Sequence, residues 1–280
     1  MSSETVAARV DARTAELATN LAALLQRVDA ACLAAGRAAD SVRLLPVTKF
    51  FPAEDVAILY RLGRREFGES REQEATAKVA ALPNLVRQSA EGVRQSTEDG
   101  RHSAGDDGYS AQGDEGLPDV QWHMIGRLQR NKAKVVARWA HTVHSVDSER
   151  LATALDAGAR AALDAGERTA PVRVLLQVSL DEDPSRGGVA PAELLALAAH
   201  VAASEGLRLS GLMAIPPLGA ESDAAFARLA TLHTMVLAEH PGATELSAGM
   251  SGDLESAIEH GSTCVRVGTA LMGARPITSA

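Results

Sequence analysis

The chain has 280 residues, of which 46% are hydrophobic and 23% charged, and its formal net charge is -8 at pH 7. This length and composition allow a large hydrophobic core, in one big domain or in two ordinary ones. The acidic balance argues against a general nucleic-acid-binding protein, because neutralising phosphates requires a basic surface. No apolar run approaches the length that crosses a membrane, so we expect no membrane partner.

The cysteines and the N-terminal residues favour an intracellular location. Cys32 and Cys264 are the two cysteines of the chain, and nothing around them has the spacing of metal ligands. The N-terminal residues, which include Glu4, lack the basic stretch and the apolar run of a signal peptide. We therefore expect a reduced, cytoplasmic protein without a metal site.

The first predicted element is a long helix over residues 4–35, which ends at Gly36. Its apolar residues recur at helical spacing: Val6, Val10, Leu17, Leu21, Leu24, Leu25 and Val28. A buried, apolar strand over residues 43–50 follows and carries Lys49 near its C-terminal end.

Beyond this strand, helical and strand patterns alternate. Helices are expected over residues 53–62, 71–82, 129–139, 148–165, 191–204, 223–239 and 253–260. Strands are expected over residues 66–70, 120–126, 142–147, 172–180, 207–215, 244–250 and 264–272. Alternation implies parallel strands with right-handed crossovers, and the total of eight strands most economically closes into a (β/α)8 TIM barrel with an extra N-terminal helix. A doubly wound open sheet is the alternative, but it leaves the placement of the polar residues unexplained.

One segment interrupts this single barrel domain, which we expect to span residues 1–280. Residues 88–118 are rich in Gly, Ser, Gln, Asp and Glu and hold hardly any large apolar side chains. Such a segment buries too little surface to offset its ordering entropy, so we predict a disordered insertion. An ordered acidic lid is the alternative interpretation. Because the insertion precedes the third strand, on the side away from the barrel mouth, we expect it to leave the site unaffected.

In such a barrel the active site lies at the C-terminal ends of the strands. Burial of the Lys49 ammonium there should lower its pKa and leave a neutral amine that can form a Schiff base. On Lys49 alone, a lysine that reaches the surface is the simpler interpretation. The other polar or unusual residues at the strand ends are Glu69, Ser70, Trp122, His123, Asp147, Met213, Ser247, Arg266, Gly268 and Thr269.

Three of these residues predict a phosphate site, because the loops after strands seven and eight commonly hold one. Ser247 offers a hydroxyl, Gly268 allows close approach to its backbone N–H, and Thr269 adds another donor. Opposite Lys49, they indicate a pocket for a phosphorylated carbonyl compound, either a sugar phosphate or pyridoxal phosphate.

Arg266 distinguishes these two ligands. It lies two residues before Gly268, so both side chains share one face of the strand. A guanidinium only donates hydrogen bonds, and opposite a pyridine nitrogen it would keep that nitrogen unprotonated and weaken the ring as an electron sink. Pairing of Arg266 with Glu69 or Asp147 is the alternative interpretation.

Several ordered blocks of residues carry a resemblance to a known family. They are Val47-Thr48-Lys49, Phe67-Gly68-Glu69-Ser70-Arg71-Glu72-Gln73-Glu74, residues 122–132, His144-Ser145-Val146-Asp147, residues 183–188, Gly211-Leu212-Met213, residues 246–251 and residues 265–275. By these blocks the chain resembles the pyridoxal-phosphate homeostasis proteins, which are single-barrel relatives of the alanine racemase N-terminal domain. The resemblance covers nearly the whole chain apart from the insertion.

The resemblance implies roles for individual residues. It implies that Lys49 holds pyridoxal 5'-phosphate (PLP) as a Schiff base and that Arg266 faces the pyridine nitrogen. Ser247, Gly268 and Thr269 are then the phosphate-binding residues, and Ser70 and Met213 complete the expected cofactor-binding set. The family usually has Asn where this chain has Ser70.

The resemblance also implies a function in PLP homeostasis: holding PLP, limiting the free aldehyde and supplying it to apoenzymes. The related racemases need a second acid–base group, a tyrosine from another domain. Here Tyr60 belongs to the first barrel helix and Tyr109 to the insertion. We therefore expect a protein that is not an enzyme, with a weak amino-acid racemase as the alternative. His123 is a lone acid–base candidate, although a strand histidine is more often simply hydrogen-bonded.

Two further possibilities stay open at this point. A cofactor-free Schiff-base aldolase would need its lysine on a later strand, beside acid–base carboxylates, whereas Lys49 lies on the first strand. The basic run Arg127, Arg130, Lys132 and Lys134 is either a solvated helix face or a surface that steers an anionic ligand or a protein partner.

Overall fold

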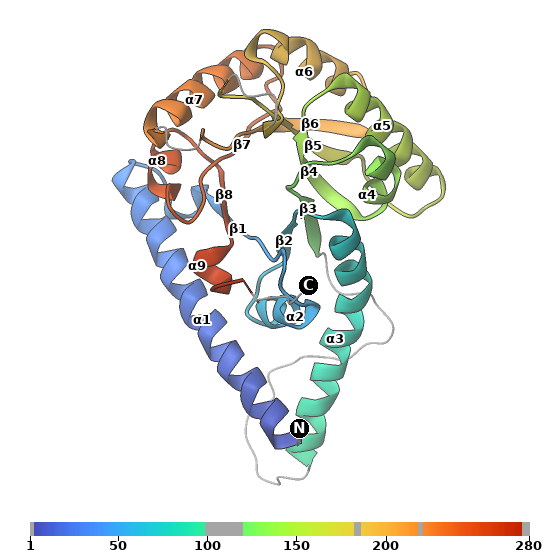
Figure 1. Ribbon diagram of the computed structural model, residues 1–280, viewed down its shortest axis with the longest axis vertical. Helices are drawn as coiled ribbons and strands as arrows, with labels where there is room; N and C mark the ends of the chain where they lie inside the picture. The colour runs from blue at the N-terminus through green and yellow to red at the C-terminus, as the bar shows by residue number, and fades with distance from the viewer. Residues whose placement is uncertain (1–2, 99–119, 182–185, 218–220, 276–280) are drawn as a thin grey trace.

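The computed structural model describes residues 3–98, 120–181, 186–217 and 221–275. Eight strands form one parallel sheet in the order β1-β8-β7-β6-β5-β4-β3-β2. Their bounds are β1 Arg43–Pro46, β2 Glu66–Glu69, β3 Gln121–Met124, β4 Ala140–Val146, β5 Val172–Gln177, β6 Leu207–Met213, β7 Glu245–Ser247 and β8 Cys264–Val267. A parallel bridge between Val47 and Gly68 joins the two end strands, so the sheet curls into a nearly closed barrel (Figure 1). The predicted (β/α)8 fold is thus confirmed, and the open-sheet alternative is wrong.

Helices surround the ring of strands (Figure 1). They are α1 Ser3–Ala34, α2 Ala53–Arg61, α3 Glu72–Glu98, α4 Ala133–Trp139, α5 Glu149–Asp164, α6 Leu194–Ala202, α7 Ser222–Glu239, α8 Leu254–Glu259 and α9 Thr269–Met272, with 3-10 turns at Ala39–Ser41, Arg130–Lys132 and Pro191–Glu193. The extra helix α1 lies along the outside of the barrel, in contact with α8 and α9. Its stripe of Leu17, Leu21, Leu24 and Val28 is buried, which accounts for the helical spacing of these residues.

The hydrophobic core fills the space between the strands and the helices. Val143 of β4, Leu212 of β6 and residues 174–176 of β5 are fully buried. Parallel strands that are covered on both faces read as near-continuous apolar runs, which is the pattern seen in residues 174–176 of β5.

The end of the predicted eighth strand is a helix instead. Strand β8 stops at Val267, and residues 269–272 form α9. Leu271 and Met272 are buried there, as they would be in a strand. A short apolar run does not separate a buried strand from a buried helical turn, so the prediction was wrong in this part.

Helix α3 continues through Pro83 to Glu98, so the prediction that it ends near Leu82 is wrong. Proline within a helix costs about 3 kcal/mol. That cost is offset by the buried Leu82 and by Leu85 and Val86, which pack against the core on either side of the proline. Residues 88–98 of the predicted insertion therefore lie in this helix, and residues 99–118 lie outside the described residues.

Candidate functional site

A buried polar cluster fixes the chain just before Lys49, at the mouth of the barrel. Thr48 is fully buried, its N–H donates to the Gly68 carbonyl at 3.0 Å, and its hydroxyl donates to Glu69 Oε1 at 2.6 Å. Lys78 Nζ donates to the same Glu69 oxygen at 2.7 Å and to the Thr48 carbonyl at 2.8 Å. Because the N–H, the hydroxyl and the carbonyl of Thr48 are all hydrogen-bonded, these partners also fix where the side chain of Lys49 begins.

The residue after Lys49 has an unusual backbone conformation. Phe50 has φ of 69°, in the left-handed region that non-glycine residues rarely adopt. Its ring lies among three cations: Lys49 Nζ is 5.8 Å from the ring centroid, the Arg71 guanidinium 5.0 Å and the Arg275 guanidinium 4.5 Å. The turn at Phe50 thus places an aromatic ring that can gather positive charge at the mouth.

The environment of Lys49 favours its neutral form. Burial lowers the pKa of Lys49, and the positive charges of Arg275 and Arg266 lower it further, while Glu69 acts in the opposite direction. A lysine attacks a carbonyl only as the free amine, so a lowered pKa increases its reactivity near neutral pH. The downward shift expected from the sequence is confirmed.

Lys49 opens into a cavity of about 420 Å³ at the C-terminal ends of the strands. The described residues that line it are Val47, Lys49, Phe50, Phe51, Ser70, Ile125, Gly126, Arg127, Gln177, Arg186, Ile215, Met250, Ser251, Gly252, Arg266, Gly268, Thr269, Gly273 and Arg275. Five of these are basic and none is acidic. A cavity with this lining attracts an anion.

One end of the cavity is formed by the loops after β7 and β8. Among the described residues, no group accepts a hydrogen bond from the backbone N–H of Gly268 or Thr269. The Ser251 hydroxyl lies beside them and accepts from the Ala270 N–H at 3.3 Å. Free N–H groups next to a hydroxyl are the donors that a phosphate uses.

Arg266 lines the same cavity from β8, although its side chain is only 5% exposed. Its Nη1 donates to Ser247 Oγ at 2.7 Å and its Nη2 to the Ala214 carbonyl at 3.0 Å. Arg266 forms no ion pair with a carboxylate of the described residues, so the alternative pairing with Glu69 or Asp147 is not present there: Glu69 is bound to Lys78, and Asp147 Oδ2 accepts from the Gly188 N–H at 3.4 Å. Both partners of the guanidinium are neutral, so its positive charge is not compensated by a carboxylate in contact.

Ser70 reaches the cavity because a glycine, Gly126, follows β3. A Cβ on Gly126 would lie 2.2 Å from the Ser70 carbonyl oxygen, so only glycine allows the two backbones to approach this closely. The Gly126 carbonyl in turn accepts from the Ser145 hydroxyl at 2.6 Å. The backbone at Ser70 is therefore well fixed, and a contact between its hydroxyl and a ligand stays a prediction.

Two residues of the predicted set, Met213 and Ser247, do not line the cavity. Met213 is 1% exposed and lies at the end of β6, beside Ser247 on β7. Ser247 is fully buried, and its hydroxyl is bound to Arg266 and, at 3.0 Å, to His144. Ser247 thus lies behind Arg266 rather than at the phosphate end.

The sequence reasoning missed Ser251 and Arg275, which do line the cavity. Ser251 belongs to one of the blocks that carried the family resemblance, and it follows the strand that ends in Ser247. Since ligands bind in the loops beyond the strand ends, the later serine was the better candidate. Arg275, which lies beyond the last strand, is likewise the final residue of the block 265–275 that carried the resemblance.

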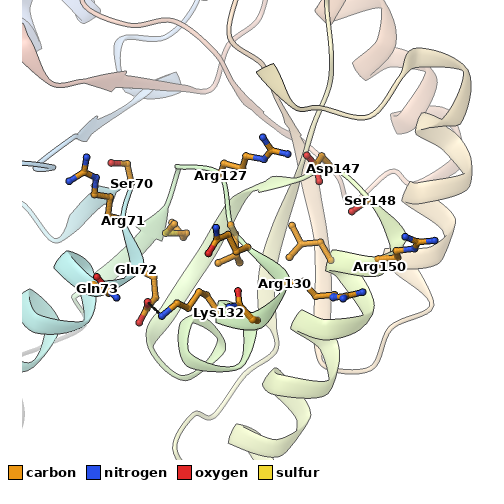
Figure 2. Close-up of a pocket in the computed structure, with 15 residues that line it drawn as sticks. Ser70, Arg71, Glu72, Gln73, Arg127, Arg130, Lys132, Asp147, Ser148 and Arg150 are labelled. Carbon is orange, nitrogen blue, oxygen red and sulfur yellow. Dashed lines mark ion pairs between the residues drawn. The ribbon is translucent and has the colours of Figure 1, made fainter. Parts of the chain in front are cut away.

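A second, larger hollow of about 1190 Å³ adjoins this cavity and shares Ser70 and Arg127 with it. We call this hollow the basic groove. Figure 2 shows that it is lined by residues from the start of α3, from the segment between β3 and α4, and from the start of α5. Lys132 is paired with Glu72 at 3.2 Å. Within the part of the chain that the structure describes, Arg127, Arg130 and Arg150 have no ion-pair partner.

Comparison with known proteins identifies the family. The family model described as "Alanine racemase, N-terminal domain" matches residues 17–276. The pyridoxal phosphate homeostasis protein of Mycobacterium tuberculosis is 53% identical over 270 residues, which cover 95% of this chain and 96% of that protein. The chain belongs to the pyridoxal phosphate homeostasis protein family. The resemblance seen in the sequence is thus confirmed.

Solved structures agree with this assignment. PipY of Synechococcus elongatus, solved with PLP bound, is 34% identical and superposes with a TM-score of 0.69, covering 92% of this chain and 100% of that chain. Alanine racemase of Streptomyces coelicolor is 21% identical with a TM-score of 0.63, covering 94% of this chain and 59% of the racemase. This second likeness concerns the fold alone.

The described residues contain neither a metal-binding cluster nor a membrane-spanning helix. No group of three or more His, Cys, Asp or Glu residues there could hold a metal ion. None of the helices in the described part is both long enough and apolar enough to cross a membrane.

Proposed function

We propose that this chain binds PLP as a Schiff base on Lys49 and acts in PLP homeostasis. The observation that carries the proposal is the arrangement in one cavity of a lysine with a lowered pKa, a buried arginine and free backbone N–H groups. PLP combines an aldehyde, a pyridine nitrogen and a phosphate, and each of these would find a matching group. The names and the bound PLP of the relatives support the same ligand.

The residues around the cavity fit PLP end by end. Gly268 and Thr269 would bind the phosphate through their backbone N–H groups, with Ser251 adding its hydroxyl. Arg266 would donate to the pyridine nitrogen, and the amine of Lys49 would form a Schiff base with the aldehyde carbon, whose oxygen would leave as water. When bound, PLP would supply an electron sink, but a donated hydrogen bond from a guanidinium leaves the ring unprotonated and weakens that sink.

We propose that the chain holds its cofactor without turning over a substrate. Among the described residues that line the cavity, Lys49 is the one acid–base side chain besides the arginines, and arginines keep their protons. Racemisation needs a second such group on the opposite face of the substrate. Tyr60 is 7% exposed and packs in the core under Arg65, away from the cavity, and Tyr109 lies outside the described residues.

Exchange of the α-hydrogen of alanine for deuterium separates a carrier from a weak racemase. A carrier that is fully loaded with PLP should exchange this hydrogen no faster than free PLP does. Rapid exchange that disappears in Lys49→Ala would contradict the carrier proposal and favour the racemase. The aldolase hypothesis lacks support, because no carboxylate is among the described residues that line the cavity, and Glu69 is bound to Lys78 and Thr48.

We also propose that the basic groove receives the apoenzymes to which PLP is supplied. The groove adjoins the cavity, and Arg127, Arg130 and Arg150, which have no ion-pair partner among the described residues, stand out in a chain of net charge -8. An acidic surface around the cofactor site of a recipient would complement them. Water would hydrolyse the Schiff base on Lys49, and the released PLP would then pass from one mouth to the other. We place this exchange in the cytoplasm, where the free cysteines Cys32 and Cys264 stay reduced.

The docking proposal is tested with Arg130→Ser/Arg150→Ser, two residues that line the groove but not the cavity. This variant should bind PLP as the parent does and should load an apo-aminotransferase several-fold more slowly at low salt. Arg208→Ser is the matched control, because Arg208 is an exposed arginine near the opposite, N-terminal end of β6. Equal transfer rates for all three proteins would refute docking in the groove.

A further inference from the structure

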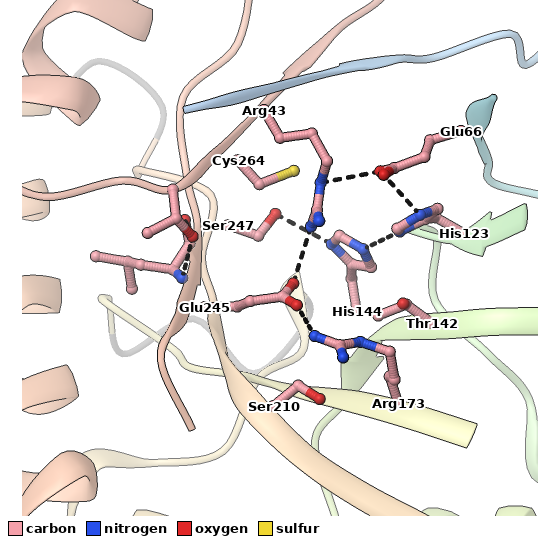
Figure 3. Close-up of polar contacts among 12 residues, drawn as sticks. Arg43, Glu66, His123, Thr142, His144, Arg173, Ser210, Glu245, Ser247 and Cys264 are labelled. Carbon is pink, nitrogen blue, oxygen red and sulfur yellow. Dashed lines mark hydrogen bonds and ion pairs between the residues drawn. The ribbon is translucent and has the colours of Figure 1, made fainter. Parts of the chain in front are cut away.

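A line of buried polar side chains runs through the barrel behind Arg266. Ser247 Oγ accepts from Arg266 Nη1 at 2.7 Å and lies 3.0 Å from His144 Nδ1. His144 Nε2 is 2.9 Å from His123 Nδ1, and His123 Nε2 is 3.4 Å from Glu66 Oε2. Figure 3 shows this line from Ser247 to Glu66. We call Arg266, Ser247, His144, His123 and Glu66 the relay. Ser247 and His144 are fully buried and His123 is 1% exposed, so no part of the relay except Arg266 lines the cavity.

Both ends of this relay impose the same direction on its hydrogen atoms. At one end a guanidinium can only donate, so Ser247 Oγ must accept from Arg266. At the other end Arg43 Nε lies 2.9 Å from Glu66 Oε2. Burial alone would raise the pKa of Glu66, but its contacts with His123 and Arg43 outweigh burial and lower the pKa. Glu66 is therefore ionised, and although its 3.4 Å contact with His123 Nε2 is not aligned as a hydrogen bond, its charge favours the tautomer of His123 with the hydrogen on Nε2.

The two histidines between these ends then have one consistent arrangement. Burial lowers the pKa of both His123 and His144, so each is neutral and carries a single N–H. His123 Nδ1 accepts, which requires the hydrogen of His144 to lie on Nε2. His144 Nδ1 in turn accepts from the Ser247 hydroxyl. Every hydrogen of the relay thus points from Arg266 toward Glu66.

We propose that Ser247, His144, His123 and Glu66 are positioning residues that hold the guanidinium of Arg266 against the ring nitrogen of bound PLP. The inference rests on the proposed function. It assigns a role to a carboxylate near the N-terminal ends of the strands, at the opposite end of the barrel from the cofactor.

The relay gives Glu66 a route to Arg266. With an uncharged side chain at position 66, His123 can move its hydrogen to Nδ1, and His144 then carries its own on Nδ1. Ser247 Oγ would receive hydrogen bonds from both His144 and Arg266, and its own hydrogen would lose its acceptor. A buried donor without an acceptor is unfavourable, so the position of Arg266 would change.

The direction of the relay is tested first in the protein without cofactor. Nitrogen-15 NMR of the imidazole rings at pH 7 should show His123 and His144 as neutral rings protonated on Nε2. In Glu66→Gln, at least one of the two rings should change its tautomer or become a mixture. Protonation on Nδ1 in the parent, or a doubly protonated ring, would overturn the proposed direction.

The effect on PLP is tested with Ser247→Ala and Glu66→Gln, two variants at different points of the relay. Both should bind PLP roughly 3- to 10-fold more weakly. Both should also shift the absorbance maximum of bound PLP, a readout that a general loss of stability would not move. Ser247→Thr, which keeps the hydroxyl, should restore the parent spectrum.

Ser210→Ala is the matched control, because Ser210 is also a buried strand serine, 2% exposed, and donates to the Arg208 carbonyl outside the relay. If Glu66→Gln and Ser247→Ala fold and bind PLP with the affinity and the spectrum of the parent, the positioning role is refuted. If the parent itself fails to bind PLP, the proposed function is refuted, and the NMR result on the relay remains informative.

Discussion

The backbone at Phe50 leads to a prediction about a single residue. Its φ of 69° is unfavourable for any residue with a Cβ. We expect Phe50→Gly to be more stable than Phe50→Ala by about 1 kcal/mol, the reverse of the usual order, because glycine adopts this conformation freely. Urea unfolding of the two variants measures the difference. An alanine variant as stable as the glycine variant would show that the turn relaxes.

At the phosphate end of the cavity the structure has Ser251 where the sequence predicted Ser247. This difference leads to a second prediction about single residues. Ser251→Ala should weaken the binding of PLP but leave the binding of pyridoxal, which has no phosphate, nearly unchanged. Ser247→Ala should instead weaken the binding of PLP and the binding of pyridoxal by the same factor, because Ser247 contacts Arg266. Fluorescence titration of both proteins with both ligands measures the ratio. The same ratio in the two variants would contradict the assignment.

Single residues also mark how far the site could be predicted from the sequence. Lys49, Arg266, Gly268 and Thr269 were predictable, because strand ends of a barrel converge on one mouth and these residues line one cavity. Ser247 was misplaced because β7 has only three residues, and the sequence does not mark where so short a strand ends. The polar contacts behind Arg266 join five strands and could not be read from local patterns.

At the scale of elements, α1 is part of the barrel's structure rather than an appendage. Leu17 is fully buried, whereas Leu33 on the same helix is 67% exposed. Leu17→Ala should therefore lower the free energy of unfolding by about 2–5 kcal/mol, and Leu33→Ala should change it by less than about 0.5 kcal/mol. Denaturant midpoints of the two variants give the comparison. Similar small effects would mean that α1 detaches without unfolding the barrel.

Individual helices and strands differ in how well the sequence predicts them. The alternation of helical and strand patterns predicted the eight strands and their closure into a barrel. Clear apolar periodicity identifies the elements, and short loops leave few ways to arrange them. The pattern missed α9 and the second half of α3. In both places tertiary burial decided the outcome: Leu271 and Leu82 are buried in helices where local preference indicated a strand and a helix end.

At the scale of the whole molecule, buried histidines make stability depend on pH. Burial lowers the pKa of His123, His141 and His144, in the case of His141 to about 4. In the unfolded chain these groups titrate near pH 6.5. Below that pH the unfolded state therefore binds more protons than the native state, and stability is lost as the pH falls from about 6.5 toward 4.

Two buried carboxyl groups modify this dependence. Glu66, with a lowered pKa, adds to the loss at low pH, whereas Glu69, with a raised pKa, opposes it. His141→Asn isolates one histidine. Between pH 7 and pH 5 this variant should lose less stability than the parent, by on the order of 1 kcal/mol after allowance for solvent screening. Parallel curves for the two proteins would contradict the role of His141.

The central claim is that Lys49 holds PLP covalently, and the visible absorbance spectrum of the purified protein with added PLP tests it most directly. The parent should show the band of PLP bound to an amine, and borohydride reduction should place the label on Lys49 in a peptide map. The band should be absent from Lys49→Ala and retained in the control Lys134→Ala, which changes an exposed lysine of α4. A colourless parent, or an unchanged band in Lys49→Ala, would contradict the account.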